Sequence, residues 1–362
     1  MSSLCAAPRF CTPLAILATI HWVAQPCCCL RLGIMVTSRW AEHERRQTQR
    51  HAIHSCTPAT GSGHDIELLF FMGDPHAEEE AAALREQAES GDMVQVGGPD
   101  TDPPVPRDAT YVLDRPCART FRLAHGTAWL AANRPEQDYV MYLDDDSFLN
   151  LPRLLFHLEH QATDRLAMGF VMETQLDWSS THVCELCDPC EPCRNDTATL
   201  DFCAMFPDMS LGGCIMAVQN CQIFEDTEGD YTLARCVAVK HRAIARLAQY
   251  FGSTHAPRWM LGMGWVFGSR IVQYIGRNAN RLKVRGAADV SLGFWLAPME
   301  GVRFVSMNDG YFHDHPESKS IFARPCTDQS VLVHRMTPAS WNAGFDAEKC
   351  ELTCDGAGSI EA

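Results

Sequence analysis

Apolar runs alternate with helix-like stretches between residues 30 and 150 of the chain. Each short apolar run predicts a strand, and the stretches between them predict helices. The predicted strands are 32–38, 66–72, 93–96 and 139–143, and the predicted helices include 45–50, 76–90 and 119–132. This alternation predicts an α/β fold with a mostly parallel, Rossmann-like sheet flanked by helices. In such sheets, ligands bind beyond the carboxyl ends of the strands.

Three consecutive aspartates, Asp144, Asp145 and Asp146, directly follow the apolar run at 139–143, where a buried strand would reach the surface. Adjacent carboxylates repel one another, and a divalent cation such as Mg or Mn neutralises them through hard oxygen ligands. A solvated acidic turn explains an isolated triplet equally well. The triplet is therefore a candidate metal site whose support must come from the rest of the chain.

Composition limits the classes of function. The chain has 362 residues and is 46% hydrophobic, which is enough for one enzyme-sized unit. Its 30 basic residues against 45 acidic ones, and its net charge of -15, argue against nucleic-acid binding, because phosphate backbones are held by dense basic surfaces. A nucleotide held locally through a metal remains compatible with this charge.

Residues 1–29 are compatible with export. Arg9 precedes a short apolar run at 14–20, which continues to residue 24 through His21. A bilayer-spanning helix needs about 20 apolar residues, and this run is shorter. We expect a signal peptide or a signal anchor, with possible membrane anchoring at the N-terminus, and a buried N-terminal helix is the alternative.

Cysteine usage points to an oxidising compartment, because the chain contains 18 cysteines. Eight of them lie within residues 177–236, which we interpret as a cysteine-rich insertion in the sheet domain. These are Cys184, Cys187, Cys190, Cys193, Cys203, Cys214, Cys221 and Cys236. Iron-sulfur and zinc ligation both fit repeated Cys-x-x-Cys units. The glycosylation acceptor Asn195-Asp196-Thr197 instead favours disulfides in a secreted protein.

Two segments near the C-terminus carry further candidates. Gly264 and Trp265 belong to an apolar run that contains several glycines. In one interpretation, the glycines let the backbone approach a ligand and the tryptophan stacks on a sugar ring. In the other, the run is a core strand with a glycine bulge. Asp289 stands among small and apolar residues. Burial there would raise its basicity and make it a candidate general base, and a helix N-cap is the alternative.

Three histidines, His313, His315 and His334, lie in two short polar patches. Any of them would be able to complete a cation site with the aspartates. A single histidine is more often a packed or solvated residue than a ligand. The local sequence does not choose among the three.

Six short motifs follow one another in the order found in a known family. The chain resembles the inverting β-1,3-glycosyltransferases, which include the β-1,3-galactosyltransferases, the fringe enzymes and the core 1 galactosyltransferases. The resemblance covers residues 30–341, interrupted by the cysteine-rich insertion. The matching segments are Arg50-x-Ala52-Ile53-His54, Arg119-Thr120, Tyr142-Leu143-Asp144-Asp145-Asp146-Ser147-Phe148-Leu149-Asn150, Gly262-x-Gly264-Trp265-Val266-x-x-Ser269, Asp289-Val290-x-x-Gly293 and Val331-Leu332-Val333-His334.

The resemblance implies a GT-A fold over residues 30–362 and a function. A UDP-sugar would donate galactose or an N-acetylhexosamine to a hydroxyl of a glycan or glycoprotein acceptor, with inversion and a β-1,3 linkage. Asp146 and His334 would hold Mn2+ or another divalent cation, and Asp289 would be the catalytic base. The residues at the nucleotide sugar would be Arg50, Arg119, Asp144, Asp145, Gly264 and Trp265. The family also implies the Golgi lumen of the secretory pathway and a type II membrane topology.

The chain departs from the family pattern at single positions, and the asparagine-containing segment that usually precedes the Lys-Thr pair is absent. Ala288 replaces the acid that precedes Asp289, and Cys56 stands where the family commonly has tryptophan. These departures leave open a glycan-binding pseudoenzyme without turnover. A secreted metal or redox module centred on the cysteine run is a third hypothesis, and it leaves the aspartate triplet unexplained.

Overall fold

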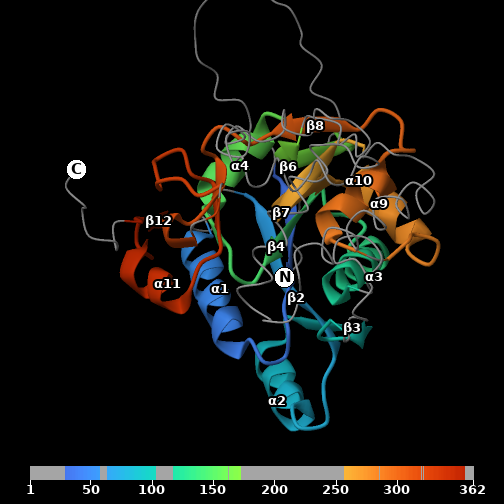
Figure 1. Cartoon of the computed structure of the whole chain (residues 1–362), viewed down its shortest axis with the longest axis horizontal. Helices are drawn as coiled ribbons and strands as arrows, with labels where there is room; N and C mark the ends of the chain where they lie inside the picture. Colours follow the sequence, from blue (N-terminus) through green and yellow to red (C-terminus); the bar gives the residue numbers. More distant parts are fainter. Residues whose placement is uncertain are drawn as a thin grey trace, which may run out of the picture.

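The computed structural model describes residues 29–57, 63–102, 117–161, 163–172, 257–284, 286–318, 320 and 322–354. The cysteine-rich insertion, the sequon at Asn195 and residues 1–28 lie outside these residues. The described residues form a central sheet with helices on both of its faces (Figure 1). No helix among them is both long enough and apolar enough to cross a membrane.

Seven strands form the central sheet, in the order β3-β2-β1-β4-β7-β6-β8. Their bounds are β1 (Arg31–Thr37), β2 (Asp65–Asp74), β3 (Met93–Pro99), β4 (Tyr139–Asp144), β6 (Leu166–Met172), β7 (Trp259–Gly268) and β8 (Arg303–Ser306). Strands β3, β2, β1 and β4 are parallel to one another, β6 is parallel to β8, and β7 runs antiparallel to both of its neighbours. The prediction of a mostly parallel sheet is confirmed.

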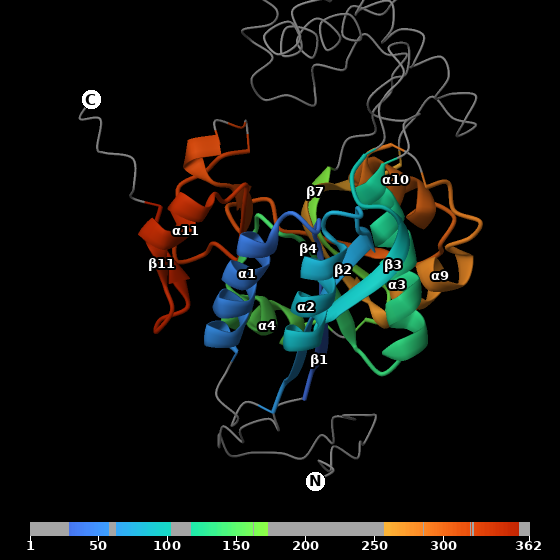
Figure 2. The same cartoon turned by 90° about the horizontal axis from the view of Figure 1, so that it is seen from below.

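Side chains alternate between two apolar layers, as expected for strands buried on both faces. Ile34 packs in the layer that contains Leu154 and Leu158 of α4, and its neighbour Met35 packs in the layer that contains Leu123 of α3. The helices are α1 (His43–Cys56), α2 (Glu80–Ser90), α3 (Ala118–Asn133), α4 (Leu151–Glu159), α9 (Ser269–Asn278) and α10 (Ala288–Leu296). Helices α1 and α4 lie on one side of the sheet, and α3, α9 and α10 lie on the other (Figure 2).

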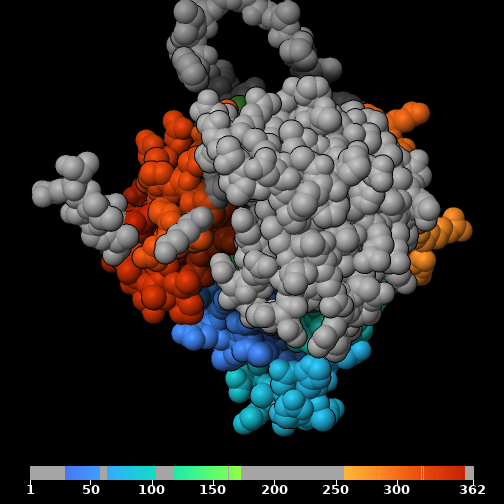
Figure 3. Space-filling view, viewed as in Figure 1, coloured from blue at the N-terminus to red at the C-terminus, as the bar shows by residue number. Residues whose placement is uncertain are grey.

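Residues 312–354 form a C-terminal unit beside α1 (Figure 3). Strand β10 (Leu332–His334) lies between β9 (Phe312–Asp314) and β5 (Phe148–Leu149) in a three-stranded sheet. The other elements of the unit are the 3-10 turn η2 (Pro316–Ser318), the helix α11 (Pro338–Gly344) and the hairpin of β11 (Phe345–Asp346) and β12 (Glu351–Leu352). Trp341 of this unit packs edge-on against Phe148, with 5.6 Å between ring centroids.

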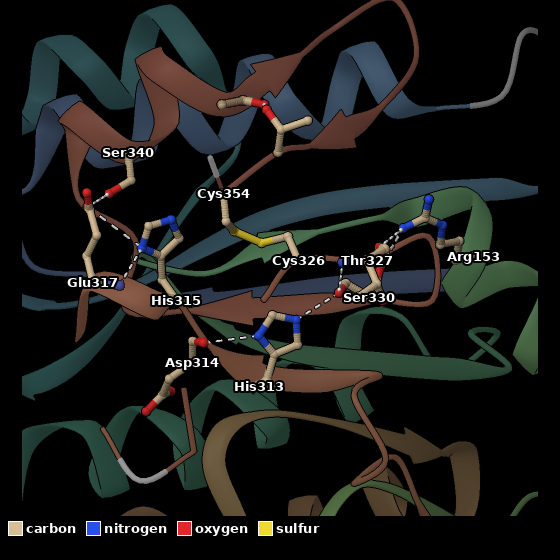
Figure 4. Close-up of a disulfide and its surroundings, with 12 residues drawn as sticks. Arg153, His313, Asp314, His315, Glu317, Cys326, Thr327, Ser330, Ser340 and Cys354 are labelled. Atoms are coloured by element: carbon tan, nitrogen blue, oxygen red, sulfur yellow. Dashed lines mark hydrogen bonds and ion pairs between the residues drawn. A yellow bond between two sulfur atoms is a disulfide. The ribbon is translucent and has the colours of Figure 1, made fainter. Parts of the chain in front are cut away.

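Two disulfides hold the C-terminal unit. Cys56, the last residue of α1, is bonded to Cys350 across 294 residues of sequence, and Cys326 is bonded to Cys354 (Figure 4). The strands of this sheet have only two or three residues each, so their own ladder is weak. Because a crosslink restricts the unfolded chain, a disulfide typically contributes about 2–4 kcal/mol of stability. The covalent links therefore compensate for the short strands.

Candidate metal and nucleotide site

Three loops meet at the carboxyl end of the parallel strands and line a cleft of about 420 Å³. The loops follow β1, β3 and β4, and α1 and α3 complete the walls. The lining residues are Thr37, Ser38, Arg39, Arg45, Asp100, Thr101, Asp102, Ala118, Arg119, Arg122, Asp144, Asp145 and Asp146. A cleft of this size at this end of a parallel sheet is a typical ligand site.

Asp144, Asp146 and His334 form a compact cluster whose ligand atoms all lie within 4.8 Å of one another. His334 Nε2 lies 3.5 Å from Asp146 Oδ1 and 3.8 Å from Asp144 Oδ2. Asp146 Oδ1 is buried and has no hydrogen-bond partner among the described residues. Two carboxylates and an imidazole that converge on one point could hold a divalent cation.

Backbone pairing brings His334 to the aspartates. Strand β10 pairs with β5, which follows the aspartate triplet almost directly in sequence. Just beyond His334, the amide of Met336 donates a hydrogen bond of 2.7 Å to the carbonyl of Asp146. The main chain therefore fixes the distance between His334 and the aspartates.

The ring nitrogens of the other two candidate histidines have hydrogen-bond partners outside this cluster. His313 Nε2 lies 2.8 Å from Ser330 Oγ, and His313 Nδ1 lies 3.0 Å from the carbonyl of Asp314 (Figure 4). His315 Nδ1 accepts a hydrogen bond of 3.3 Å from the amide of Glu317. Among the described histidines, His334 is the one that joins the aspartate cluster.

Charges in the cluster are strongly coupled. Burial raises the pKa of Asp144, although the nearby Arg119 acts in the opposite direction. Burial lowers the pKa of His334, but its hydrogen bond to Asp314 and the charges of the aspartates outweigh burial, so the net shift is upward. A bound cation would relieve the repulsion between Asp144 and Asp146 and would compete with a proton for His334.

Asp145 faces a different way from its two neighbours. Its Oδ2 accepts a hydrogen bond of 2.6 Å from Ser38 Oγ, and Arg45 Nη1 lies 3.2 Å from its Oδ1. Arg119, in contrast, reaches Asp144, with 2.9 Å between Nη1 and Oδ2. The aspartate triplet therefore connects the cluster of Asp144, Asp146 and His334 to two arginines of the cleft wall.

Several residues of the cleft were not among the sequence-based candidates, and Asp100 shows why. Its carboxylate accepts from the amide of Trp40 at 3.0 Å and from the amide of Gly73 at 3.3 Å. Arg122 of α3 donates to the Asp100 carbonyl at 2.7 Å. These contacts join segments that are far apart in sequence. One indication of a role for Asp100 is visible in the sequence, which is its place shortly after the predicted strand 93–96.

The structure does not bring Arg50 to the aspartates. Arg50 binds Asp92 through two hydrogen bonds of 2.7 and 2.8 Å, and it donates to Glu86 at 2.9 Å. Burial alone raises the pKa of Glu86, but its hydrogen bonds with Arg46 and other basic partners lower it to about 2. Arg50 thus belongs to an ion-pair network that joins α1 to α2 and to Asp92, the residue before β3. Arg45 of the same helix lines the cleft instead.

Replacing Arg45 and Arg50 by glutamine should therefore affect different properties. The Arg50 variant should lose stability, and the Arg45 variant should lose ligand affinity. We expect Arg50→Gln to lower the free energy of unfolding by about 2–3 kcal/mol, because it removes both hydrogen bonds to the Asp92 carboxylate and one of several basic partners of Glu86. UDP affinity should stay unchanged. Arg45→Gln should leave the melting temperature nearly unchanged and weaken UDP binding about tenfold. Denaturant unfolding and calorimetry measure both quantities. Weakened UDP binding in a stable Arg50→Gln protein would restore Arg50 to the site.

Gly264 and Trp265 lie in β7, and the structure corrects the expectation for the tryptophan. Trp265 is completely buried, stacks on Tyr142 with 4.4 Å between ring centroids, and donates from Nε1 to the Leu261 carbonyl at 2.7 Å. Its ring is a core element and does not form a wall of a sugar pocket. A Cβ on Gly264 would lie 2.6 Å from Leu332 Cδ1, so the glycine lets β10 approach β7.

Asp289 is the second residue of α10 and is not its N-cap, a position that Ala287 occupies. Its Oδ1 accepts a hydrogen bond of 2.8 Å from the amide of Val290. Burial raises the pKa of Asp289, the charge of Arg119 lowers it, and the charge of Asp144 raises it. Asp289 is therefore close enough to the cleft to interact electrostatically with two of its residues, and its role as a base stays a prediction.

Comparisons with known proteins give limited information. No protein-family model and no curated protein matches the chain. Similar solved structures include an active-site mutant of LgtC, with 10% identity and a TM-score of 0.40 over 84% of this chain and 88% of that chain. The bifunctional glycosyltransferase WbbM has 9% identity and a TM-score of 0.35 over 84% of this chain and 45% of that chain. Mouse xyloside xylosyltransferase 1 has 11% identity and a TM-score of 0.35, over 84% and 96%. These TM-scores are too low to assign a function to this chain.

Proposed function

We propose that this protein is a metal-dependent inverting glycosyltransferase of the GT-A type. The observation that carries the proposal is the cluster of Asp144, Asp146 and His334, which adjoins a cleft lined by arginines. The donor is a UDP-sugar that carries galactose or an N-acetylhexosamine, the acceptor is a hydroxyl of a glycan or glycoprotein, and the product linkage is β-1,3. The sugar and the linkage rest on the motif resemblance.

The cluster fits a divalent cation. Its donor set of two carboxylates and one imidazole suits Mn2+, which accepts both oxygen and nitrogen ligands. The buried Asp146 Oδ1, which lacks a protein partner among the described residues, supplies an available ligand atom. A bound divalent cation would act as a Lewis acid and stabilise the negative charge that develops on the leaving diphosphate.

Arginines of the cleft suit the same diphosphate. Arg39, Arg45 and Arg119 line the cleft beside the aspartate triplet, and guanidinium groups bind phosphate oxygens in bidentate geometry. Asp144 raises the pKa of Arg119, so this guanidinium stays charged at all accessible pH values. Asp144 and Asp145 would orient the donor ribose. The arginines would therefore hold the diphosphate of the nucleotide, and the two aspartates would hold its ribose.

In this proposal, Asp289 receives the proton of the acceptor hydroxyl. As the acceptor oxygen bonds to the anomeric carbon, its proton passes to the Asp289 carboxylate, and the bond between that carbon and the diphosphate oxygen breaks. The electron pair of the broken bond leaves with UDP. A carboxylate whose pKa is raised by burial is a stronger base than one in water, which suits this task.

A panel of UDP-sugars tests the proposal. With Mn2+ present, we expect transfer to a glycan acceptor, or slow hydrolysis, from UDP-galactose or from a UDP-N-acetylhexosamine, and loss of both with a chelator. A glycan-binding pseudoenzyme would bind UDP and Mn2+ but turn over no donor. That reading has one specific support, because Asp289 is the only acid in the first turn of α10. Turnover that is unaffected by chelator would contradict the proposal.

We also propose a location in the secretory pathway, in the Golgi lumen. The disulfides Cys56–Cys350 and Cys326–Cys354 support it, since such bonds persist mainly in oxidising compartments. Anchoring through residues 1–29 remains an expectation from sequence.

A further inference from the structure

Asp314 is a buried carboxylate that contacts the metal cluster through His334. It is the last residue of β9, only 2% exposed, and lies directly beside His334 in the parallel pairing of β9 with β10. Its Oδ1 lies 2.7 Å from His334 Nδ1. Arg335 Nε lies 3.1 Å from its other oxygen. Both carboxylate oxygens are therefore engaged, one by the histidine and one by an arginine.

This contact determines which ring nitrogen of His334 is free. An ionised carboxylate can only accept hydrogen bonds, so Nδ1 must carry the proton that it donates. In the neutral imidazole, the lone pair then lies on Nε2, which is the nitrogen that faces Asp146 at 3.5 Å and Asp144 at 3.8 Å. The same contact limits rotation of the ring about its bond to Cβ.

We propose that Asp314 is a positioning residue that holds His334 with Nε2 directed at the cation shared with Asp144 and Asp146. Carboxylates that accept from the second nitrogen of a metal-bound histidine fix its tautomer and make it a better ligand. The inference rests on the proposed metal site and adds to it the residue that makes His334 a ligand. Arg335 balances the charge that Asp314 would otherwise leave buried.

The surroundings of Asp314 supply a matched control. His313, the preceding residue of β9, is only 1% exposed, and its Nε2 lies 2.8 Å from Ser330 Oγ (Figure 4). Because neighbouring residues of a strand point to opposite faces, His313 lies on the other face of the sheet from Asp314 and His334. Ser330→Ala therefore breaks a buried hydrogen bond of the same strand without touching His334. If Asp314 mattered only for the stability of β9, Asp314→Ala and Ser330→Ala would change the affinity for Mn2+ in the same way.

The test uses Mn2+ alone with the purified full-length protein. Free Mn2+ measured by electron paramagnetic resonance gives the affinity, and electron spin-echo envelope modulation detects a histidine nitrogen bound to Mn2+. We expect Asp314→Ala to weaken Mn2+ binding about 10- to 100-fold and to lose the nitrogen modulation. Ser330→Ala should keep both, even where its melting temperature falls as far as that of Asp314→Ala.

The possible outcomes separate this inference from the function on which it rests. Nitrogen modulation in the wild type that persists in Asp314→Ala with full affinity overturns the role of Asp314 and leaves the metal site intact. Equal losses in Ser330→Ala also overturn it, because they reveal a general effect of β9 stability. A wild type that binds no Mn2+ through nitrogen removes the proposed metal site itself, and this inference with it.

Discussion

Replacing Asp146 by asparagine is expected to abolish cation-dependent UDP binding. The substitution keeps the size of the side chain but removes the charge of a carboxylate whose buried Oδ1 has no hydrogen-bond partner among the described residues. Mn2+ would then lose a charged ligand, and we expect its affinity to fall by about 100-fold or more. Calorimetric titration of UDP at fixed Mn2+ concentration measures the loss.

An exposed aspartate provides the control for this variant. Asp309 lies in the turn between β8 and β9 on the surface, so Asp309→Asn changes the net charge by the same amount without reaching the cleft. Its UDP affinity should match that of the wild type. If Asp146→Asn retains cation-dependent UDP binding at the wild-type level, the aspartate triplet is an acidic turn and not a metal site.

Replacing Asp289 by asparagine is expected to reduce sugar transfer while leaving the donor site intact. A general base acts on the acceptor hydroxyl and does not contact the diphosphate, so its loss should lower turnover by about 100- to 10,000-fold. UDP and Mn2+ affinities should remain close to those of the wild type. Steady-state kinetics with the best donor of the panel, combined with calorimetry, separates the two effects.

The comparison of the two variants identifies the role of each carboxylate. Asp146→Asn should lose binding, and with it transfer, whereas Asp289→Asn should lose transfer alone. Transfer at nearly the wild-type rate by a folded Asp289→Asn protein would place the base elsewhere. Asp289 would then be a half-buried acid of the first turn of α10, where negative charge is favoured by the helix dipole.

Local sequence predicted the parallel strands well, because short apolar runs that alternate with helix-like stretches are typical of strands buried on both faces. The predicted strand 139–143 is β4, which ends at Asp144, so the aspartate triplet lies at the carboxyl end of the strand as expected. Local sequence did not choose His334 over His313, since both are histidines in short polar patches. The motif resemblance pointed to His334. The pairing of β10 with β5 explains why this histidine lies beside the aspartates.

The other site residues could not be assigned from sequence, because the sequence does not show in which direction each side chain points. Arg45 and Arg50 lie on the same helix, but their different directions place one in the cleft and the other against Glu86 and Asp92. Trp265 alternates with Gly264 along β7, and its stacking on Tyr142 depends on the register between β4 and β7. Neither direction follows from spacing in the sequence, because both depend on partners about 35 or more residues away.

The C-terminal unit was the least predictable part of the fold. Its strands have two or three residues each, which is too short for a periodic signal. Cys56 and Cys350 are separated by 294 residues, and no local pattern indicates that they pair. Yet this unit carries His334 and Asp314, so the completeness of the metal site depends on long-range contacts.

Calorimetric titration of UDP into the wild-type protein, with Mn2+ and then with a chelator, tests the proposed donor site most directly. Because the cluster of Asp144, Asp146 and His334 adjoins the arginine-lined cleft, we expect UDP to bind with one-to-one stoichiometry when Mn2+ is present. Binding should weaken by about 100-fold or more when the cation is removed. UDP that binds equally well in chelator, or that does not bind with Mn2+ present, would contradict a metal-dependent nucleotide-sugar site in this cleft.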